Sequence, residues 1–153
     1  MIGIWDIIKV IFPAAIAYTM PLLMGALGGL YSERSGVTNL CIEGLMLFGC
    51  FASAAAIVKL QAAGVGFTLS IVIGIVVAMV ASMALSYLHA LASINLKADQ
   101  TISGTAINML STALTMFLAQ TITGSGNITI VRGIIRSDIP LLSSIPVLGP
   151  LFF

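Results

Sequence analysis

The stretch YSERSGVTNLCIEGLMLFGCF, from Tyr31 to Phe51, places a short charged turn between two long apolar segments. Glu33 and Arg34 lie in the turn, and Glu43 follows inside the second apolar segment. A carboxylate inside a membrane span costs about 2.5–3.5 kcal/mol on insertion scales. We therefore expect Glu43 to meet either a partner within a helix bundle or a water-filled path, and the rest of the chain to form that bundle.

The composition of the whole chain is that of an integral membrane protein. Of its 153 residues, 59% are hydrophobic and 7% are charged, whereas a soluble domain carries about 25% charged residues. The formal net charge is +1, which gives no indication of a nucleic-acid partner. Membrane lipid is the expected surrounding.

Four apolar segments are long enough to cross a membrane as helices, and they cover residues 10–30, 38–58, 67–88 and 102–122. Residues 123–138 are expected to form a loop. Residues 139–153 are apolar but contain Pro140, Pro146 and Pro150. Because proline breaks a helix interior, this last segment is expected to be re-entrant or interfacial. The sequence thus predicts one all-α membrane domain, a polytopic bundle of about four transmembrane helices.

Basic residues beside these spans indicate the orientation. If every span crosses the membrane, one side carries Lys9, Lys59, Arg132 and Arg136, and the other carries Arg34 and Lys97. Cytoplasmic loops carry an excess of lysine and arginine. The amino terminus is therefore expected inside the cell.

Small residues recur at helical spacing in the first and third spans. Gly25 and Gly29 form a G-x-x-x-G pattern. In the third span a small residue occurs at every fourth position, at Gly74, Ala78, Ser82 and Ser86. Such stripes let membrane helices approach closely, so we expect these residues at helix–helix contacts.

Polar residues share a face in the second and fourth spans. Asn39 and Glu43 are spaced to lie on one helix face. The polar face of the fourth span consists of Thr105, Asn108, Thr112 and Thr115. Lipid satisfies such groups poorly, so the face is expected to turn inward. It either lines a solute route or bonds neighbouring helices, and spacing leaves both open.

Two interpretations of Glu43 stay open at this stage. As a structural residue it would pair with Arg34, Lys97 or a backbone group of another helix. As a functional residue it would line a pathway or act as a gate, as ionisable groups inside membranes often do.

Motifs for catalysis and metal binding are absent from the sequence. It contains no G-x-x-x-x-G-K-[ST], no H-E-x-x-H and no C-x-x-C. His89 is the only histidine. We therefore expect no catalytic residue, no metal site and no cofactor. Two classes remain, a transport or channel subunit and a structural membrane-assembly protein.

Two stretches resemble a known family of transport proteins. The first is S-E-R-S-G-V at residues 32–37, continued by Asn39 and by Glu43-Gly44, and the second is L-K-A-D-Q-T-I-S-G-T-A-I-N at residues 96–108. Both are similar to stretches of the permeases of bacterial ABC importers for nucleosides. The wider group includes permeases for simple sugars and branched-chain amino acids. Such permeases are longer than this chain, which looks like the amino-terminal half of one.

The resemblance implies a mechanism and a set of partners in the bacterial plasma membrane. A second permease subunit would complete the pathway, and an extracellular lipid-anchored binding protein would deliver the nucleoside. A cytoplasmic ABC ATPase subunit would hydrolyse ATP and drive alternating access, so the chain itself is not expected to be an enzyme. The alternatives are a permease for a simple sugar or other small solute, and a membrane-assembly protein that transports nothing.

The resemblance also directs attention to particular polar residues. We expect the translocation pathway to be lined or braced by Asn39, Glu43, Asn108, Thr112 and Thr115. The remaining motif residues are Glu33, Arg34, Asp99, Gln100 and Ser103. An aspartate before a helix satisfies free amide groups there. The last three are therefore expected to cap the fourth helix rather than to contact solute.

Overall fold

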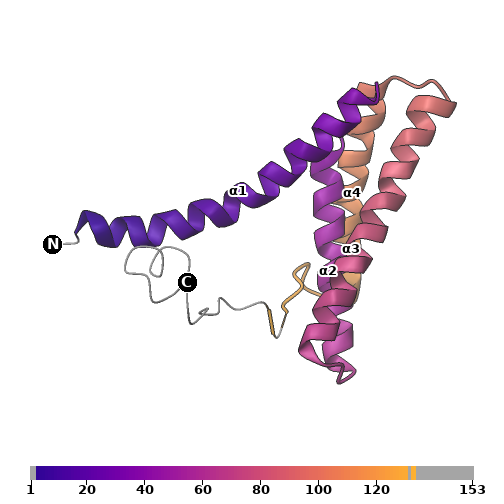
Figure 1. Ribbon diagram of the computed structural model, residues 1–153. Helices are drawn as coiled ribbons and strands as arrows, with labels where there is room; N and C mark the ends of the chain where they lie inside the picture. Colours follow the sequence, from indigo (N-terminus) through magenta and orange to yellow (C-terminus); the bar gives the residue numbers. More distant parts are fainter. Residues whose placement is uncertain (1–2, 131, 134–153) are drawn as a thin grey trace. The chain divides into compact units, whose positions relative to one another are not determined.

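The computed structural model describes residues 3–130, 132 and 133 as long α-helices joined by short connections. The elements are α1 (Ile4–Arg34), α2 (Ile42–Ala62), α3 (Phe67–Ala90), the π-helix η1 (Leu91–Asn95) and α4 (Gln100–Thr123) (Figure 1). No strand occurs in this part of the chain. Four helices are long and apolar enough to cross a membrane, which confirms the expected all-α fold. The expected re-entrant or interfacial segment lies outside the described residues.

The chain divides into two units, Met1–Ala26 with Gly133–Phe153, and Leu27–Arg132. In the first unit, the described structure is mainly the amino-terminal part of α1. The ammonium group of Lys9 lies 5.7 Å from the centre of the Trp5 ring. An aromatic ring and a long basic side chain are typical of the membrane interface.

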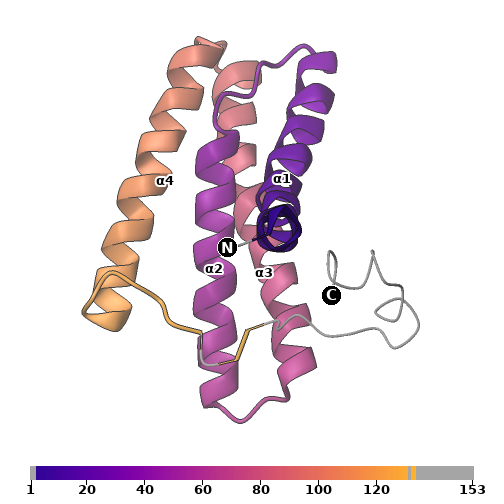
Figure 2. The ribbon, with the colours of Figure 1, turned by 90° about the vertical axis from the view of Figure 1, so that its left-hand side faces the viewer.

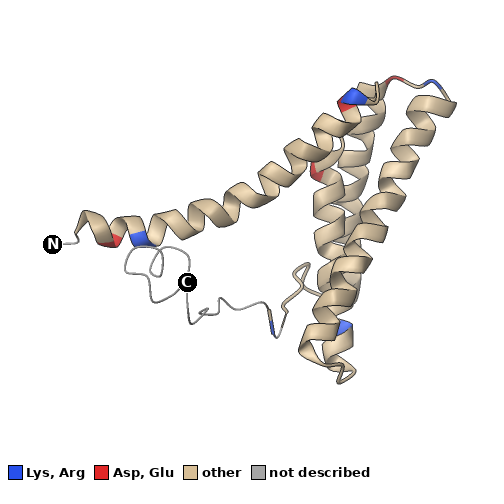
Figure 3. Cartoon of the chain, in the orientation of Figure 1, with Lys and Arg blue, Asp and Glu red and all other residues tan. Residues whose placement is uncertain are grey.

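In the second unit, α2 packs against both α3 and α4. Figure 2 shows α2 between these two helices along most of its length. Figure 3 shows charged residues near the helix ends and long uncharged stretches between them. This distribution is the one expected of helices whose central parts cross a hydrocarbon layer.

The stripe of small residues on α3 forms the contact with α2. A Cβ atom at Gly74 would lie 2.6 Å from Cγ1 of Ile57. The Ser82 hydroxyl donates a hydrogen bond of 2.9 Å to a backbone carbonyl of α2. A Cβ atom at Gly49 would meet the Ser82 hydroxyl oxygen and would lie 3.4 Å from the carbonyl oxygen of Ala78. Small side chains on both helices therefore permit the close approach.

The other residues expected to pack helices have different surroundings. A Cβ atom at Gly29 would lie 3.0 Å from Cδ1 of Ile42, so the end of α1 approaches the start of α2. Gly25 lies on α1 in the first unit. Ser86 is half-buried on α3.

The helical structure of α3 continues beyond the predicted apolar span into η1, a π-helical turn. The chain then reverses through Lys97, whose φ of 52° lies in the left-handed region. This conformation is uncommon for a residue other than glycine. The turn brings the start of α4 next to the end of α3.

Candidate functional site

The candidate site lies where the start of α2 meets the amino-terminal half of α4. Two buried glycines allow the close approach. A Cβ atom at Gly44 would lie 2.7 Å from Oδ1 and 2.9 Å from Cα of Asn108. A Cβ atom at Gly104 would lie 2.9 Å from Cβ of Leu40. At both points, the backbone of one segment therefore lies against its neighbour with no room for a side chain.

Asn108 joins α4 to the first turn of α2 through both ends of its amide. Its Oδ1 accepts a hydrogen bond of 2.7 Å from the Gly44 N–H, and its Nδ2 donates one of 2.8 Å to the Leu40 carbonyl. The first amide groups of a helix have no partner within the helix. The residue at the N-cap of α2, Cys41, makes no side-chain cap. Asn108 thus supplies from another helix a hydrogen bond that a local cap would normally supply.

Gln100 holds the connection between α1 and α2. Its Oε1 accepts a hydrogen bond of 2.7 Å from the Thr38 N–H, and its Nε2 donates one of 3.4 Å to the Gly36 carbonyl. The sequence suggested a cap on α4 for this residue. In the structure, its side chain instead bonds to a loop distant in sequence.

Asp99 occupies the N-cap position of α4. Its Oδ1 accepts hydrogen bonds of 2.8 Å from the Thr101 N–H and 3.0 Å from the Ile102 N–H. Ser103 lies one turn further on, and its hydroxyl oxygen is 3.1 Å from Nδ1 of His89. The serine therefore links α4 to the end of α3, where the histidine is 2% exposed.

Glu33 and Arg34 form the exposed end of α1. A basic residue in the last turn interacts favourably with the helix dipole. The turn that follows is closed by the Ser32 hydroxyl, which donates a hydrogen bond of 2.7 Å to the Val37 carbonyl. These two motif residues therefore lie at a helix terminus, outside the groove described next.

A groove of about 400 Å³ lies beside the α2–α4 contact, and it is lined by Glu43, Gly44, Asn108, Met109, Thr112 and Ala113. It contains three of the five residues that the sequence assigned to the translocation pathway. The other two lie elsewhere. Asn39 accepts hydrogen bonds from the backbone N–H and the thiol of Cys41. Thr115 has a buried hydroxyl without a partner among the described residues.

Glu43 is exposed in the first turn of α2. A negative charge in this position interacts favourably with the helix dipole. Within the described part of the chain its carboxylate makes no hydrogen bond or ion pair. The pairing with Arg34 or Lys97 that the sequence left open is therefore not formed there.

Ser111 was not among the expected site residues. Its side chain is 0% exposed and its hydroxyl has no hydrogen-bond partner in the described structure. A Cβ atom at Gly44 would lie 3.0 Å from this hydroxyl oxygen. Its position one turn after Asn108 on the same helix was the available sequence signal.

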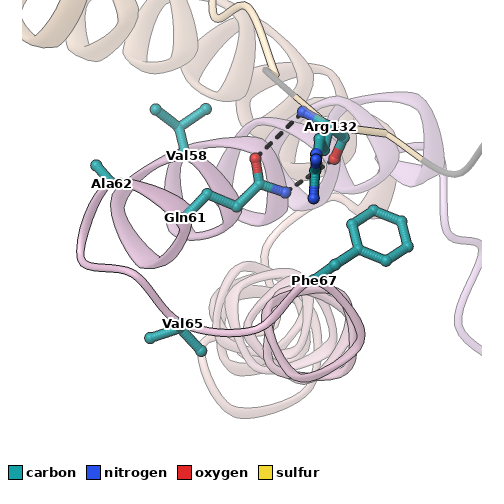
Figure 4. A pocket seen from close by; sticks show the side chains of 6 residues that line it. All are labelled: Val58, Gln61, Ala62, Val65, Phe67 and Arg132. Atoms are coloured by element: carbon teal, nitrogen blue, oxygen red, sulfur yellow. Dashed lines mark hydrogen bonds between the residues drawn. The ribbon is translucent and has the colours of Figure 1, made fainter.

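A second pocket, of about 360 Å³, lies near the connection between α2 and α3, and it is lined by Val58, Gln61, Ala62, Val65, Phe67 and Arg132. Figure 4 shows the Gln61 amide directed at the backbone of Arg132. The two hydrogen bonds, of 2.8 Å and 3.3 Å, fix the segment after α4 to the end of α2. No residue expected at a site lines this pocket, so the α2–α4 groove is the better candidate.

Comparison with known proteins relates the chain to membrane transporters. Residues 12–148 match a family described as the permease component of branched-chain amino acid transport systems. A guanosine ABC transporter permease protein of Bacillus subtilis is 41% identical over 153 residues, which cover 97% of this chain and 46% of that protein. A nucleoside ABC transporter permease protein of Lactococcus lactis is 36% identical over 146 residues, covering 95% and 45%.

A more distant relative is named for a different solute. A putative glucose ABC transporter permease protein of Haloferax volcanii is 34% identical over 145 residues, which cover 92% of this chain and 40% of that protein. The chain thus spans less than half the length of these curated relatives. No solved structure matches it.

Proposed function

Because this chain belongs to the family of permease components of branched-chain amino acid transport systems, we propose that it forms part of the membrane pathway of an ABC importer for nucleosides. The observation that carries the proposal is the 41% identity, over nearly the whole chain, to a permease named for guanosine. A second relative is named for nucleosides. Both favour a nucleoside over an amino acid as the solute.

The α2–α4 groove supports a role in the pathway. Its polar lining combines the carboxylate of Glu43, the amide of Asn108 and the hydroxyl of Thr112. A small-molecule site needs a few well-placed polar groups on a largely apolar wall. A carboxylate without a partner among the described residues also fits a water-filled path better than it fits lipid.

The mechanism that we propose requires further subunits. A second permease subunit would complete the pathway, and a cytoplasmic ABC ATPase would supply the energy for alternating access. A lipid-anchored binding protein would deliver the nucleoside from outside. The sequence contains no P-loop, so in this scheme ATP is hydrolysed on the separate subunit.

Solute uptake by a strain that lacks the gene tests the proposal. We expect uptake of radiolabelled guanosine to fall to background when the gene encoding this chain is deleted. The same gene at its native length should restore it. Uptake of glucose should not change.

Two outcomes would contradict the nucleoside assignment. If glucose uptake falls and guanosine uptake does not, the chain serves a sugar, as the name of the relative from Haloferax volcanii suggests. If no solute is affected, the chain acts in membrane assembly without transport.

A further inference from the structure

We propose that the Glu43 carboxylate recognises the transported nucleoside by accepting two hydrogen bonds from an adjacent pair of donors on the solute. This inference rests on the proposed function and names the chemistry by which the groove would select its solute. Asn108 acts here as a positioning residue for the first turn of α2, which carries Glu43.

The polar groups of the groove differ in how much of their hydrogen-bonding capacity is unused. The oxygen of the Asn108 amide and one of its N–H groups are bonded to the backbone of α2 and of the preceding turn. The Thr112 hydroxyl donates its proton to the Asn108 carbonyl at 2.9 Å. Neither side chain can bind a solute with its full capacity while these hydrogen bonds are made.

Glu43 retains its full capacity within the described structure, because no hydrogen bond or ion pair engages its oxygens there. An ionised carboxylate only accepts hydrogen bonds, and it has two oxygens with which to do so. It lies in the first turn of α2, where a negative charge interacts favourably with the helix dipole. The strongest unused group of the groove therefore selects for hydrogen-bond donors.

Two parallel donors match a carboxylate best, because bidentate, charge-assisted hydrogen bonds are stronger and more specific than single neutral ones. A guanosine molecule presents such a pair in two places. One is the N1–H and the exocyclic amino group of the base, and the other is the pair of hydroxyls at the 2′ and 3′ positions of the ribose. Both present the same chemistry to Glu43.

A further polar group without a partner in the described structure lies close to Gly44, next to the groove but not in its lining. The hydroxyl of Ser111 is fully buried beside Gly44 and has no partner within the described residues. Buried polar groups normally have a hydrogen-bond partner. Because Ser111 is fully buried and does not line the groove, Glu43 remains the group of the groove that is available to a solute.

Competition for uptake tests the inference with native-length protein in cells. Labelled guanosine is the transported probe, and unlabelled guanosine, inosine and 2′-deoxyguanosine are the competitors. Inosine lacks the exocyclic amino group, and 2′-deoxyguanosine lacks one ribose hydroxyl. We expect the native protein to discriminate against inosine if Glu43 binds the base edge, or against 2′-deoxyguanosine if it binds the ribose.

In the Glu43→Gln variant we expect this discrimination to fall by about tenfold, equivalent to about 1.4 kcal/mol, because an amide replaces one acceptor by a donor. Glu43→Asp keeps both oxygens and should keep the native order of competitors. Asp6→Asn, which removes a carboxylate from α1, is the matched control and should behave as the native protein.

Three results would overturn the inference while the proposed function stands. The native protein could accept all three competitors equally. Glu43→Gln could lower uptake of labelled guanosine and leave the discrimination between the competitors unchanged, or it could have no effect on either. A strain without the gene that still takes up guanosine would instead contradict the proposed function. Immunoblots of the membranes ensure that each variant is compared at equal abundance.

Discussion

Gly44→Val is expected to remove most of the folded protein from the membrane. The first atom of the new side chain would lie 2.7 Å from Oδ1 and 2.9 Å from Cα of Asn108. The Cα atom belongs to the backbone of α4 and cannot rotate away. Overpacking of this kind costs about 1–3 kcal/mol, and displacing Asn108 also breaks its bond to the Gly44 N–H, which adds about 1–3 kcal/mol.

The sum is large against a total stability of about 5–15 kcal/mol. Two measurements would show the effect. One is the abundance of the protein in membranes, and the other is its thermal midpoint in mild detergent, monitored by gel filtration. Gly28→Val is the matched control, because a Cβ atom at Gly28 meets nothing within 4 Å. Equal abundance and equal midpoints for the two variants would show that α2 and α4 do not pack as described.

Asn108→Leu, which keeps the number of side-chain heavy atoms but none of the hydrogen-bonding groups, is expected to destabilise the chain strongly. The substitution leaves the Gly44 N–H and the Leu40 carbonyl without the partners they have at 2.7 Å and 2.8 Å. An unsatisfied buried group costs about 1–3 kcal/mol, and Gly44 is buried whereas Leu40 is exposed, so the Gly44 N–H accounts for most of the loss. We therefore expect a clear fall in the thermal midpoint of the purified protein.

A graded pair of variants separates the two hydrogen bonds of Asn108. Asn108→Asp keeps an acceptor for the Gly44 N–H but loses the donor to Leu40, so its midpoint should lie between those of the native protein and Asn108→Leu. Asn95→Leu replaces an exposed asparagine and should have little effect. If Asn108→Leu were as stable as Asn95→Leu, the amide of Asn108 would not hold α2.

The helices could be predicted from the sequence because their length and apolar composition suffice to identify them. The residue at which α2 starts could not be predicted from the sequence. The predicted span begins at residue 38, whereas the helix begins at Ile42. The hydrogen bonds that hold the connection before this point come from Gln100 and Asn108 on α4, and no local pattern encodes them.

The spacing of polar residues indicated part of the candidate site, and the rest depends on contacts between helices. The spacing on the fourth span correctly indicated that Asn108 and Thr112 lie on one face, and the structure places both beside Glu43 in one groove. Spacing could not show that the Asn108 amide is already bonded to backbone, while the Glu43 carboxylate has no partner in the described structure. That difference depends on which helix packs against which, and the burial of Ser111 depends on it too.

These contacts join the two stretches, at residues 32–44 and 96–108, that resemble the permease family. Gln100 and Asn108 belong to the second stretch, and the backbone groups that they bind, at Gly36, Thr38, Leu40 and Gly44, lie in or beside the first. Each stretch therefore contains one half of the contact that positions the first turn of α2. Together they place Glu43 in the groove.

Chemical labelling of the groove tests most directly whether the groove belongs to a solute pathway. The probe is a charged, water-soluble thiosulfonate, added to both sides of membranes that contain Met109→Cys at native length, with the exposed Cys50 replaced by alanine. Met109 was chosen because it lines the groove. Met83→Cys is the control, because Met83 on α3 is exposed but lines neither the groove nor the second pocket. We predict that Met109→Cys reacts, that guanosine slows the reaction, and that Met83→Cys does not react. Equal reaction of the two cysteines, or labelling of Met109→Cys that guanosine does not change, would contradict a solute pathway through this groove.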